Sequence, residues 1–116
     1  FLEKINWVGF YILDEKTETL VLGPFQGLPA CVRIQSGKGV CGTSASLKKT
    51  LNIENVHNFE GHIACDSKSN SEIVIPIFKD NKLFGVLDID SPIFNRFSNE
   101  EQIFLEAFVK QLENHI

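Results

Sequence analysis

The sequence has no excess of basic residues and no long hydrophobic run, and each absence excludes a broad class of function. Eleven Lys and Arg stand against fifteen Asp and Glu, which gives a net charge of −4. A nucleic-acid-binding domain carries clustered basic residues, so we expect no nucleic-acid partner. No apolar run approaches the roughly 18 residues that a membrane helix needs, and no signal-like segment opens the chain. We therefore predict a cytoplasmic protein that does not act on a membrane.

Cysteine is scarce, and its spacing excludes the common cysteine-based scaffolds. Cys31, Cys41 and Cys65 are separated by ten and twenty-four residues, without a C-x-x-C pair. A disulfide-rich secreted domain carries more cysteines, usually in even number. A zinc site places its ligands in closer pairs, so we expect no metal, although His57 and His62 lie near Cys65. Two interpretations remain: three buried thiols in a reducing compartment, or cysteines that react with one another.

The length and composition are those of one globular domain. The chain has 116 residues, of which 43% are hydrophobic and 22% are charged, close to the average for folded domains. There are no internal repeats and no linker-like segment. We expect residues 1–116 to form a single domain, cut from a longer protein because the chain begins with Phe1.

Strand patterns dominate, with helices near the middle and at the C-terminus. Strands are predicted at 5–13, 19–22, 30–34, 50–53, 72–78 and 83–89, with a Gly- and Pro-rich loop at 23–29 and a polar loop at 55–70. The small-residue segment GVCGTSASLKK (39–49) favours a short helix. Ser98 and Glu101 form a capping box, and Phe104, Phe108, Leu112 and Ile116 follow at i, i+4 spacing as the apolar face of a terminal helix. Five or six mostly antiparallel strands with flanking helices indicate an α+β fold.

Asp88 and Asp90 interrupt an otherwise apolar strand, GVLDID. Strand alternation places both on one face, and solvent exposure at an edge strand is the simplest explanation. If the connection after Lys79 holds three residues, so that Lys79 pairs with Leu83, then Glu72 lies opposite Asp90 and joins the cluster. A two-residue turn would place Glu72 on the other face. Like charges this close are destabilising unless protonated or paired, so the cluster suggests a neutral carboxylic acid or a bound cation.

Two aromatics and two cysteines complete the candidate site. Trp7 and Tyr11 share one face of the first strand, where they either line a pocket or belong to the core. Cys41 lies at a predicted helix N-terminus, which lowers a thiol pKa, whereas Asp66 disfavours ionisation of Cys65. Local electrostatics therefore favour Cys41 as the better thiolate. The residues indicate a thiol-plus-carboxylate site without naming a reaction.

Five segments carry a family resemblance: NWVGFY (6–11), LVLGPFQGLPACVRI (20–34), GKGVCGTSA (37–45), NVHNFEGHIACDSKSNSEIVIPI (55–77) and GVLDIDSP (85–92). Together they strongly resemble the free methionine-R-sulfoxide reductases, small GAF-domain enzymes, over nearly the whole chain. The block GHIACDSKSNSEIV and the three-cysteine spacing are the specific part. The resemblance implies a GAF-like fold, a central antiparallel sheet with flanking helices, from which part of the N-terminal helical layer is missing here.

The resemblance also implies an activity and a role for each cysteine. The activity is reduction of free methionine-R-sulfoxide through a thiol, a sulfenic acid and a disulfide, with thioredoxin as external reductant and no bound cofactor. The implied protein is a cytoplasmic homodimer with a repair role under oxidative stress. Cys65 resembles the nucleophile, Cys31 the resolving thiol that forms a disulfide with Cys65, and Cys41 an auxiliary thiol. The order in which Cys41 and Cys65 act stays open.

The same resemblance extends to the acids and aromatics. Glu72, Asp88 and Asp90 resemble the acids that bind the polar end of the substrate and polarise the sulfoxide oxygen. Trp7 and Tyr11 resemble the aromatics around the methyl sulfide end. In such a site a neutral acid protonates the sulfoxide oxygen, and mutual repulsion among three acids raises one pKa.

Two alternatives from other functional classes remain. One is a non-catalytic GAF module that senses a small ligand of the cyclic-nucleotide type, for which the segment Asn95-Arg96-Phe97 is weak support. A nucleotide pocket would carry cations or a glycine-rich phosphate loop rather than three acids. The other is a dimerisation module that uses the apolar face of the terminal helix.

Overall fold

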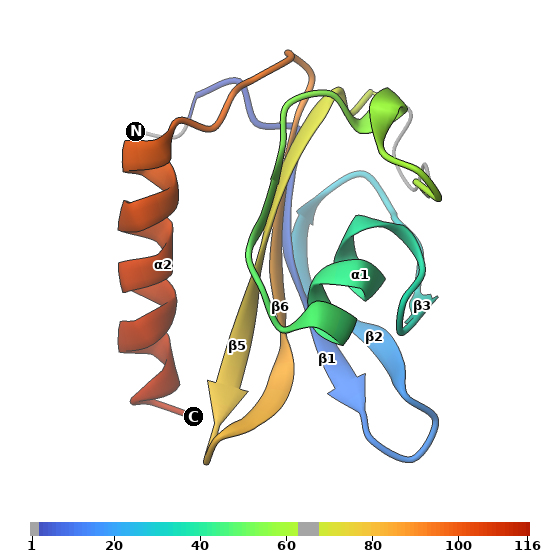
Figure 1. Cartoon of the computed structure of the whole chain (residues 1–116), viewed down its shortest axis with the longest axis vertical. Helices are drawn as coiled ribbons and strands as arrows, with labels where there is room; N and C mark the ends of the chain where they lie inside the picture. Colours follow the sequence, from blue (N-terminus) through green and yellow to red (C-terminus); the bar gives the residue numbers. More distant parts are fainter. Residues whose placement is uncertain (1–2, 63–67) are drawn as a thin grey trace.

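The computed structural model describes residues 3–62 and 68–116, and within them six strands form one antiparallel sheet of order β3-β2-β1-β6-β5-β4. The strands are β1 (Trp7–Asp14), β2 (Thr19–Gly27), β3 (Arg33–Gln35), β4 (Leu51–Ile53), β5 (Ser71–Lys79) and β6 (Lys82–Ser91). Helices α1 (Gly39–Leu47) and α2 (Asn99–Glu113) lie on opposite faces of this sheet (Figure 1). One 3₁₀ turn, Val56–Asn58, interrupts the long loop between β4 and β5. The predicted α+β fold is confirmed.

Strand alternation divides the core into two layers. Ile73 and Ile75 on β5 pack with Leu105 beneath α2, whereas Val74 and Val86 pack with α1. Each layer buries apolar side chains, so both faces of the central strands are covered. The face under α1 also receives Glu72, Asp88 and Asp90, because they share the parity of Val74 and Val86.

The loop predicted at 23–29 is wrong in part, since β2 continues through Gly23 and Pro24 to Gly27. Gly9 pairs with Phe25 and Tyr11 with Leu22, so two β2 residues face one β1 residue at a bulge. The pairing of β2 with β3 covers only Thr19–Val21. Gly23 and Pro24 therefore lie at a bulge beside β1, with no second strand next to them among the described residues, and a proline that lacks an N–H is tolerated there.

The β5–β6 hairpin also differs from the prediction in its turn. Asp80 and Asn81 form a two-residue turn with φ of 53° and 66°, as a type I′ hairpin requires. Lys79 therefore pairs with Lys82 rather than with Leu83. The expected three-residue connection is wrong.

A bulge nevertheless restores the register that the site needs. Phe78 pairs with Leu83, but the next pair is Ile77 with Gly85, so Phe84 is an extra residue on β6. This single insertion shifts the ladder by one residue. Glu72 consequently lies opposite Asp90, as predicted, although for a different reason.

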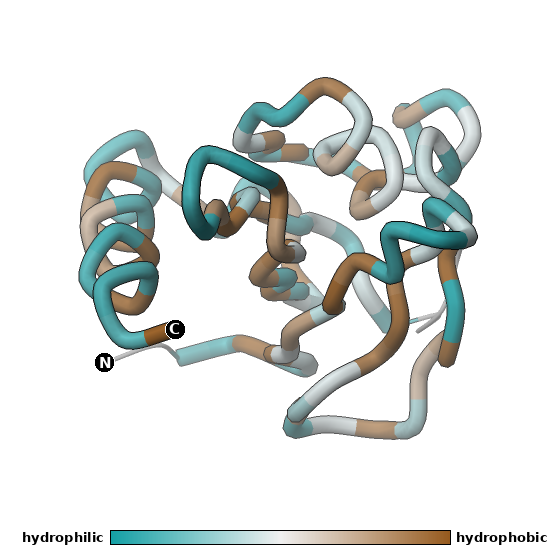
Figure 2. Tube along the Cα trace, turned by 90° about the horizontal axis from the view of Figure 1, so that it is seen from below, coloured by the Kyte–Doolittle hydropathy of each residue, from teal (hydrophilic) through white to brown (hydrophobic). Residues whose placement is uncertain are grey.

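Helix α2 begins as predicted but buries a different face. The Ser98–Glu101 capping box is present. Leu105 and Val109 are the buried residues of α2, whereas Phe104 and Phe108 are about half exposed, at 54% and 48%. Hydrophobic and hydrophilic residues alternate around its turns (Figure 2). The apolar arc of α2 is wider than its contact with the sheet. Phe104 and Phe108 of the predicted i, i+4 series therefore lie beside the buried stripe, whereas Leu112 of the same series packs against the core.

Gly85 allows β1 and β6 to approach closely. A Cβ at this position would lie 2.1 Å from the carbonyl oxygen of Tyr11, so a side chain there requires backbone movement. The absence of a side chain at residue 85 thus holds β1, which carries Trp7 and Tyr11, against the strand that carries Asp88 and Asp90.

Candidate active site

The three acids meet on the α1 side of the sheet. Glu72 on β5 pairs with Asp90 on β6, and Asp88 lies two residues before Asp90 on the same face. Their exposed fractions are only 6%, 8% and 5% in that order. Because all three acids are buried and β5 and β6 are interior strands of the sheet, solvent exposure at an edge strand does not explain them. Isolated buried charges are costly, so these acids need another reason to be there.

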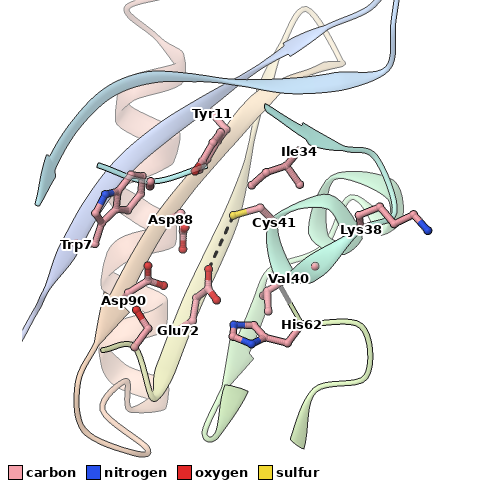
Figure 3. Close-up of a pocket in the computed structure, with 13 residues that line it drawn as sticks. Trp7, Tyr11, Ile34, Lys38, Val40, Cys41, His62, Glu72, Asp88 and Asp90 are labelled. Carbon is pink, nitrogen blue, oxygen red and sulfur yellow. Dashed lines mark hydrogen bonds between the residues drawn. The ribbon is translucent and has the colours of Figure 1, made fainter. Parts of the chain in front are cut away.

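These acids line a small cavity between the sheet and α1 (Figure 3). The cavity has a volume of about 30 Å³, and its wall comprises Trp7, Tyr11, Ala30, Ile34, Lys38, Gly39, Val40, Cys41, His62, Ser69, Glu72, Asp88 and Asp90. A volume of this size holds about one water molecule. An amino acid can therefore enter only if part of this wall moves.

The two predicted aromatics form one side of the cavity. Their rings stack with centroids 5.9 Å apart, and both side chains are almost completely buried. The Trp7 Nε1–H donates to the carbonyl oxygen of Leu28 at 3.1 Å, and the Tyr11 hydroxyl donates to that of Cys31 at 2.9 Å. Because their polar atoms are hydrogen-bonded to the backbone, the two rings form an apolar wall of the cavity.

Cys41 lies in the first turn of α1 and carries a free, buried thiol. Its Sγ donates to Oε2 of Glu72 across 3.9 Å (Figure 3). Burial raises the pKa of the Cys41 thiol well above its ordinary value, and the charges of Asp88, Glu72 and Asp90 raise it further. The expectation that the helix N-terminus lowers the pKa of Cys41 is wrong, because burial among acids outweighs the helix dipole. The comparison with Cys65 stays a prediction.

The carboxyl groups favour their neutral forms for related reasons. Burial raises the pKa of Glu72 well above its usual range, and nearby Asp88 raises it further. Burial likewise raises the pKa of Asp88, with Asp90 as the next contribution. The site therefore contains carboxylic acids that can donate a proton near neutral pH.

Of the other two predicted cysteines, the described residues include Cys31 alone. Cys31 is half-buried and packs against the core layer under α1, in the segment before β3. Cys65 lies outside the described residues. The Cys31–Cys65 disulfide and the nucleophilic role of Cys65 stay predictions.

Three polar side chains that the sequence did not single out as site residues also line the cavity: Lys38, His62 and Ser69. His62 stands in the segment GHIACDS with Cys65, in the specific part of the family resemblance, and this is the signal in the sequence that identifies it. Burial lowers the pKa of His62, and nearby His57 lowers it further. At neutral pH a largely uncharged imidazole thus faces the acids.

Comparison with known proteins agrees with this architecture. The family model for the GAF domain matches residues 4–116. The chain is 56% identical over 112 residues to the free methionine-R-sulfoxide reductase of Escherichia coli, covering 97% of this chain and 67% of that protein. It is 51% identical over 108 residues to the yeast (Saccharomyces cerevisiae) enzyme of that name, covering 91% of this chain and 60% of that protein.

Solved structures of proteins with this name or its abbreviation are also similar to this chain. The reduced form of fRMsr of Staphylococcus aureus is 58% identical with a TM-score of 0.93, covering 97% of this chain and 72% of that one. The free methionine-R-sulfoxide reductase of Neisseria meningitidis, in complex with its substrate, is 44% identical with a TM-score of 0.93, covering 95% and 66%. This chain therefore belongs to the GAF domain family and, within it, to the free methionine-R-sulfoxide reductases. In the described part of the chain, no helix has the length and apolarity to cross a membrane.

Proposed function

We propose that this chain reduces free methionine-R-sulfoxide to methionine. The observation that carries the proposal is the group of buried acids beside an aromatic wall, in a chain 56% identical to a reductase of that name. A sulfoxide oxygen leaves only when it is protonated, and a neutral carboxylic acid supplies that proton. The substrate's ammonium group neutralises another of the acids, which favours a free amino acid over a peptide.

The proposed chemistry begins with attack by Cys65 on the substrate sulfur. The Cys65 sulfur forms a bond to the substrate sulfur, and the oxygen, protonated by the neutral acid, then moves from the substrate sulfur to Cys65. The sulfur–oxygen bond of the substrate and the transient sulfur–sulfur bond break, so that methionine leaves reduced by two electrons and Cys65 is oxidised by two electrons to a sulfenic acid. Cys31 then condenses with that sulfenic acid, which releases water and forms a disulfide. An external dithiol of the thioredoxin type reduces the disulfide, so no bound cofactor is required.

The position of Cys41 supports the assignment of attack to a different thiol. The pKa of Cys41 is raised by burial and by three acids, so little thiolate forms there at neutral pH. Its thiol instead donates to Glu72. We assign Cys41 an auxiliary role, which holds the acid cluster in place.

The proposal also covers the compartment and the oligomeric state of the protein. Recycling by thioredoxin requires a reducing compartment, which agrees with the free thiol of Cys41. We therefore place the protein in the cytoplasm, as a homodimer that repairs oxidised methionine. A nucleotide-sensing role is disfavoured, because the cavity presents buried acids to its ligand.

The deciding experiment is turnover of free methionine-R-sulfoxide and of its S epimer with a thioredoxin system. We expect activity on the R epimer, abolished in Cys65→Ser and retained in part in Cys41→Ser. In Cys31→Ser we expect one equivalent of methionine per chain, because attack proceeds without resolution. Loss of activity in Cys41→Ser but not in Cys65→Ser would reverse the assignment, and inactivity on both epimers would refute the function.

A carboxamide series separates proton donation from binding. Asp90→Asn, Asp88→Asn and Glu72→Gln each keep the side-chain shape and remove a titratable proton. The variant at the proton donor should lose about 10²–10⁴-fold in kcat, whereas loss of a uniform binding contact raises KM alone. Asp80→Asn, in the exposed β5–β6 turn, is the matched control. If all three variants alter KM alone, the proton comes from another group.

A further inference from the structure

The small cavity has the dimensions and donors of a site for a single metal ion. Its volume of about 30 Å³ accommodates one ion or water molecule. The Cys41 Sγ and one carboxylate oxygen each from Glu72 and Asp88 all lie within 4.8 Å of one another. Ligands bound to zinc at about 2.0–2.3 Å lie about 3.3–3.8 Å apart in a tetrahedron, so side-chain movements of about 1 Å complete the arrangement.

An incompletely bonded carboxylate points to a ligand in this place. Asp88 is 95% buried, being 5% exposed, and its Oδ1 has no hydrogen-bond partner among the described residues. A buried carboxylate oxygen without a partner is costly. The carboxylate lies on the same side of the sheet as the Cys41 sulfur and the Glu72 carboxylate, at the cavity wall (Figure 3).

We propose that Cys41, Glu72 and Asp88 form a binding site for a thiophilic divalent cation of the Zn²⁺ or Cd²⁺ type. A thiolate ligand selects zinc-like ions, because Mg²⁺ and Ca²⁺ prefer oxygen ligands alone. On binding, the thiol and the two carboxylic acids give the protons that they hold to solvent, and the sulfur and one oxygen of each carboxylate donate an electron pair to the ion, without a change of oxidation state. Three protein ligands leave one tetrahedral position for water.

The site has a regulatory consequence that rests on the proposed function. A cation between Cys41, Glu72 and Asp88 fills the cavity that the substrate must enter, and it occupies the acids that hold and protonate the sulfoxide. Such an ion is therefore a competitive inhibitor of reduction. Binding of the ion itself requires no turnover and can be measured separately.

The test uses Zn²⁺ and Cd²⁺ salts alone and a Cys31→Ser/Cys65→Ser background, which leaves Cys41 as the sole thiol. Calorimetry should show one Zn²⁺ per chain, and Cd²⁺ should produce the ultraviolet charge-transfer band of a cadmium thiolate. Adding Cys41→Ser should remove the band. Adding Asp88→Asn should weaken Zn²⁺ binding at least tenfold, whereas the exposed-site control Asp80→Asn should leave it unchanged. Circular dichroism verifies that each variant is folded.

The outcomes separate this proposal from the proposed function. Zn²⁺ binding that persists unchanged in the Cys41→Ser variant would overturn the site and place the ion elsewhere, for example at His57 and His62, whose rings lie 6.5 Å apart. If the added Cys41→Ser or Asp88→Asn variant does not fold, the Cys31→Ser/Cys65→Ser protein itself remains decisive: Cd²⁺ should give the thiolate band, and excess methionine should displace the ion. A band that methionine leaves unchanged would refute the shared cavity. Cation binding without sulfoxide turnover would refute only the function.

Discussion

Replacing one buried acid should make the protein more resistant to rising pH. The native pKa values of Glu72 and Asp88 are raised above their unfolded values, chiefly by burial. A native group with a raised pKa keeps a proton that the unfolded chain has lost. Its contribution to stability is complete below the unfolded pKa and is lost as pH rises through the folded pKa. The free energy of unfolding of the wild-type chain should therefore fall as pH rises from neutral to mildly alkaline.

The size of this fall in the free energy of unfolding follows from the number of extra protons that the native state retains. Each group that holds one extra proton in the native state lowers the free energy of unfolding by about 1.4 kcal/mol per pH unit. Glu72 and Asp88 together give a slope of at most about 2.7 kcal/mol per unit, or about 4 kcal/mol between about pH 6.5 and about pH 8. Asp88→Asn removes one of the two groups, so its slope should be at most about half as steep.

Within this pH window, the pH dependence of stability reports on the buried acids and not on His62 or Cys41. The lowered pKa of His62 gives a contribution of opposite sign, which is confined to pH values below about 6.5. The raised pKa of the Cys41 thiol contributes only above the pH where an unfolded thiol ionises, about 8.5. A chelator keeps the acids metal-free.

Urea titrations at several pH values provide the assay. The single tryptophan, Trp7, is 2% exposed and reports unfolding by its fluorescence. The matched control is Asp80→Asn, which makes the same chemical change at an exposed turn. A wild-type stability that stays level over this window, or equal slopes for wild type and Asp88→Asn, would refute the inference that the cluster retains its protons.

Two predictions concern the scaffold, and both are measured by the same urea unfolding. Gly85→Ala should lower the free energy of unfolding by several kcal/mol, on the order of the largest single-residue effects, since its Cβ would lie 2.1 Å from the Tyr11 carbonyl oxygen; a loss within about 0.5 kcal/mol would contradict the close approach. Leu105→Ala should cost about 2–5 kcal/mol because the side chain is 4% exposed. Phe108→Ala, at a half-exposed position of the same helix, should cost well under half as much, and equal costs would place the buried stripe of α2 incorrectly.

Features that depend on local geometry were predictable from the sequence alone. Strand alternation places Asp88 and Asp90 on one face whatever surrounds them, because the side-chain period of a strand is two. The Ser98–Glu101 capping box identifies the start of α2 for a similar reason, since its hydrogen bonds join residues three apart. The segments around Trp7, Cys41 and Glu72 also carried the family resemblance, which the comparisons confirm.

Features that depend on distant neighbours were decided by the tertiary structure. Glu72 reaches Asp90 only because the extra residue Phe84 offsets a two-residue turn, and sequence patterns do not reveal such a bulge. Cys41 has the helix position that lowers a thiol pKa, yet its burial away from water and, after that, the acids from β5 and β6 raise its pKa. Burial and opposing charge come from residues far along the chain, so the fold determines the chemistry of a thiol whose position the sequence alone had identified.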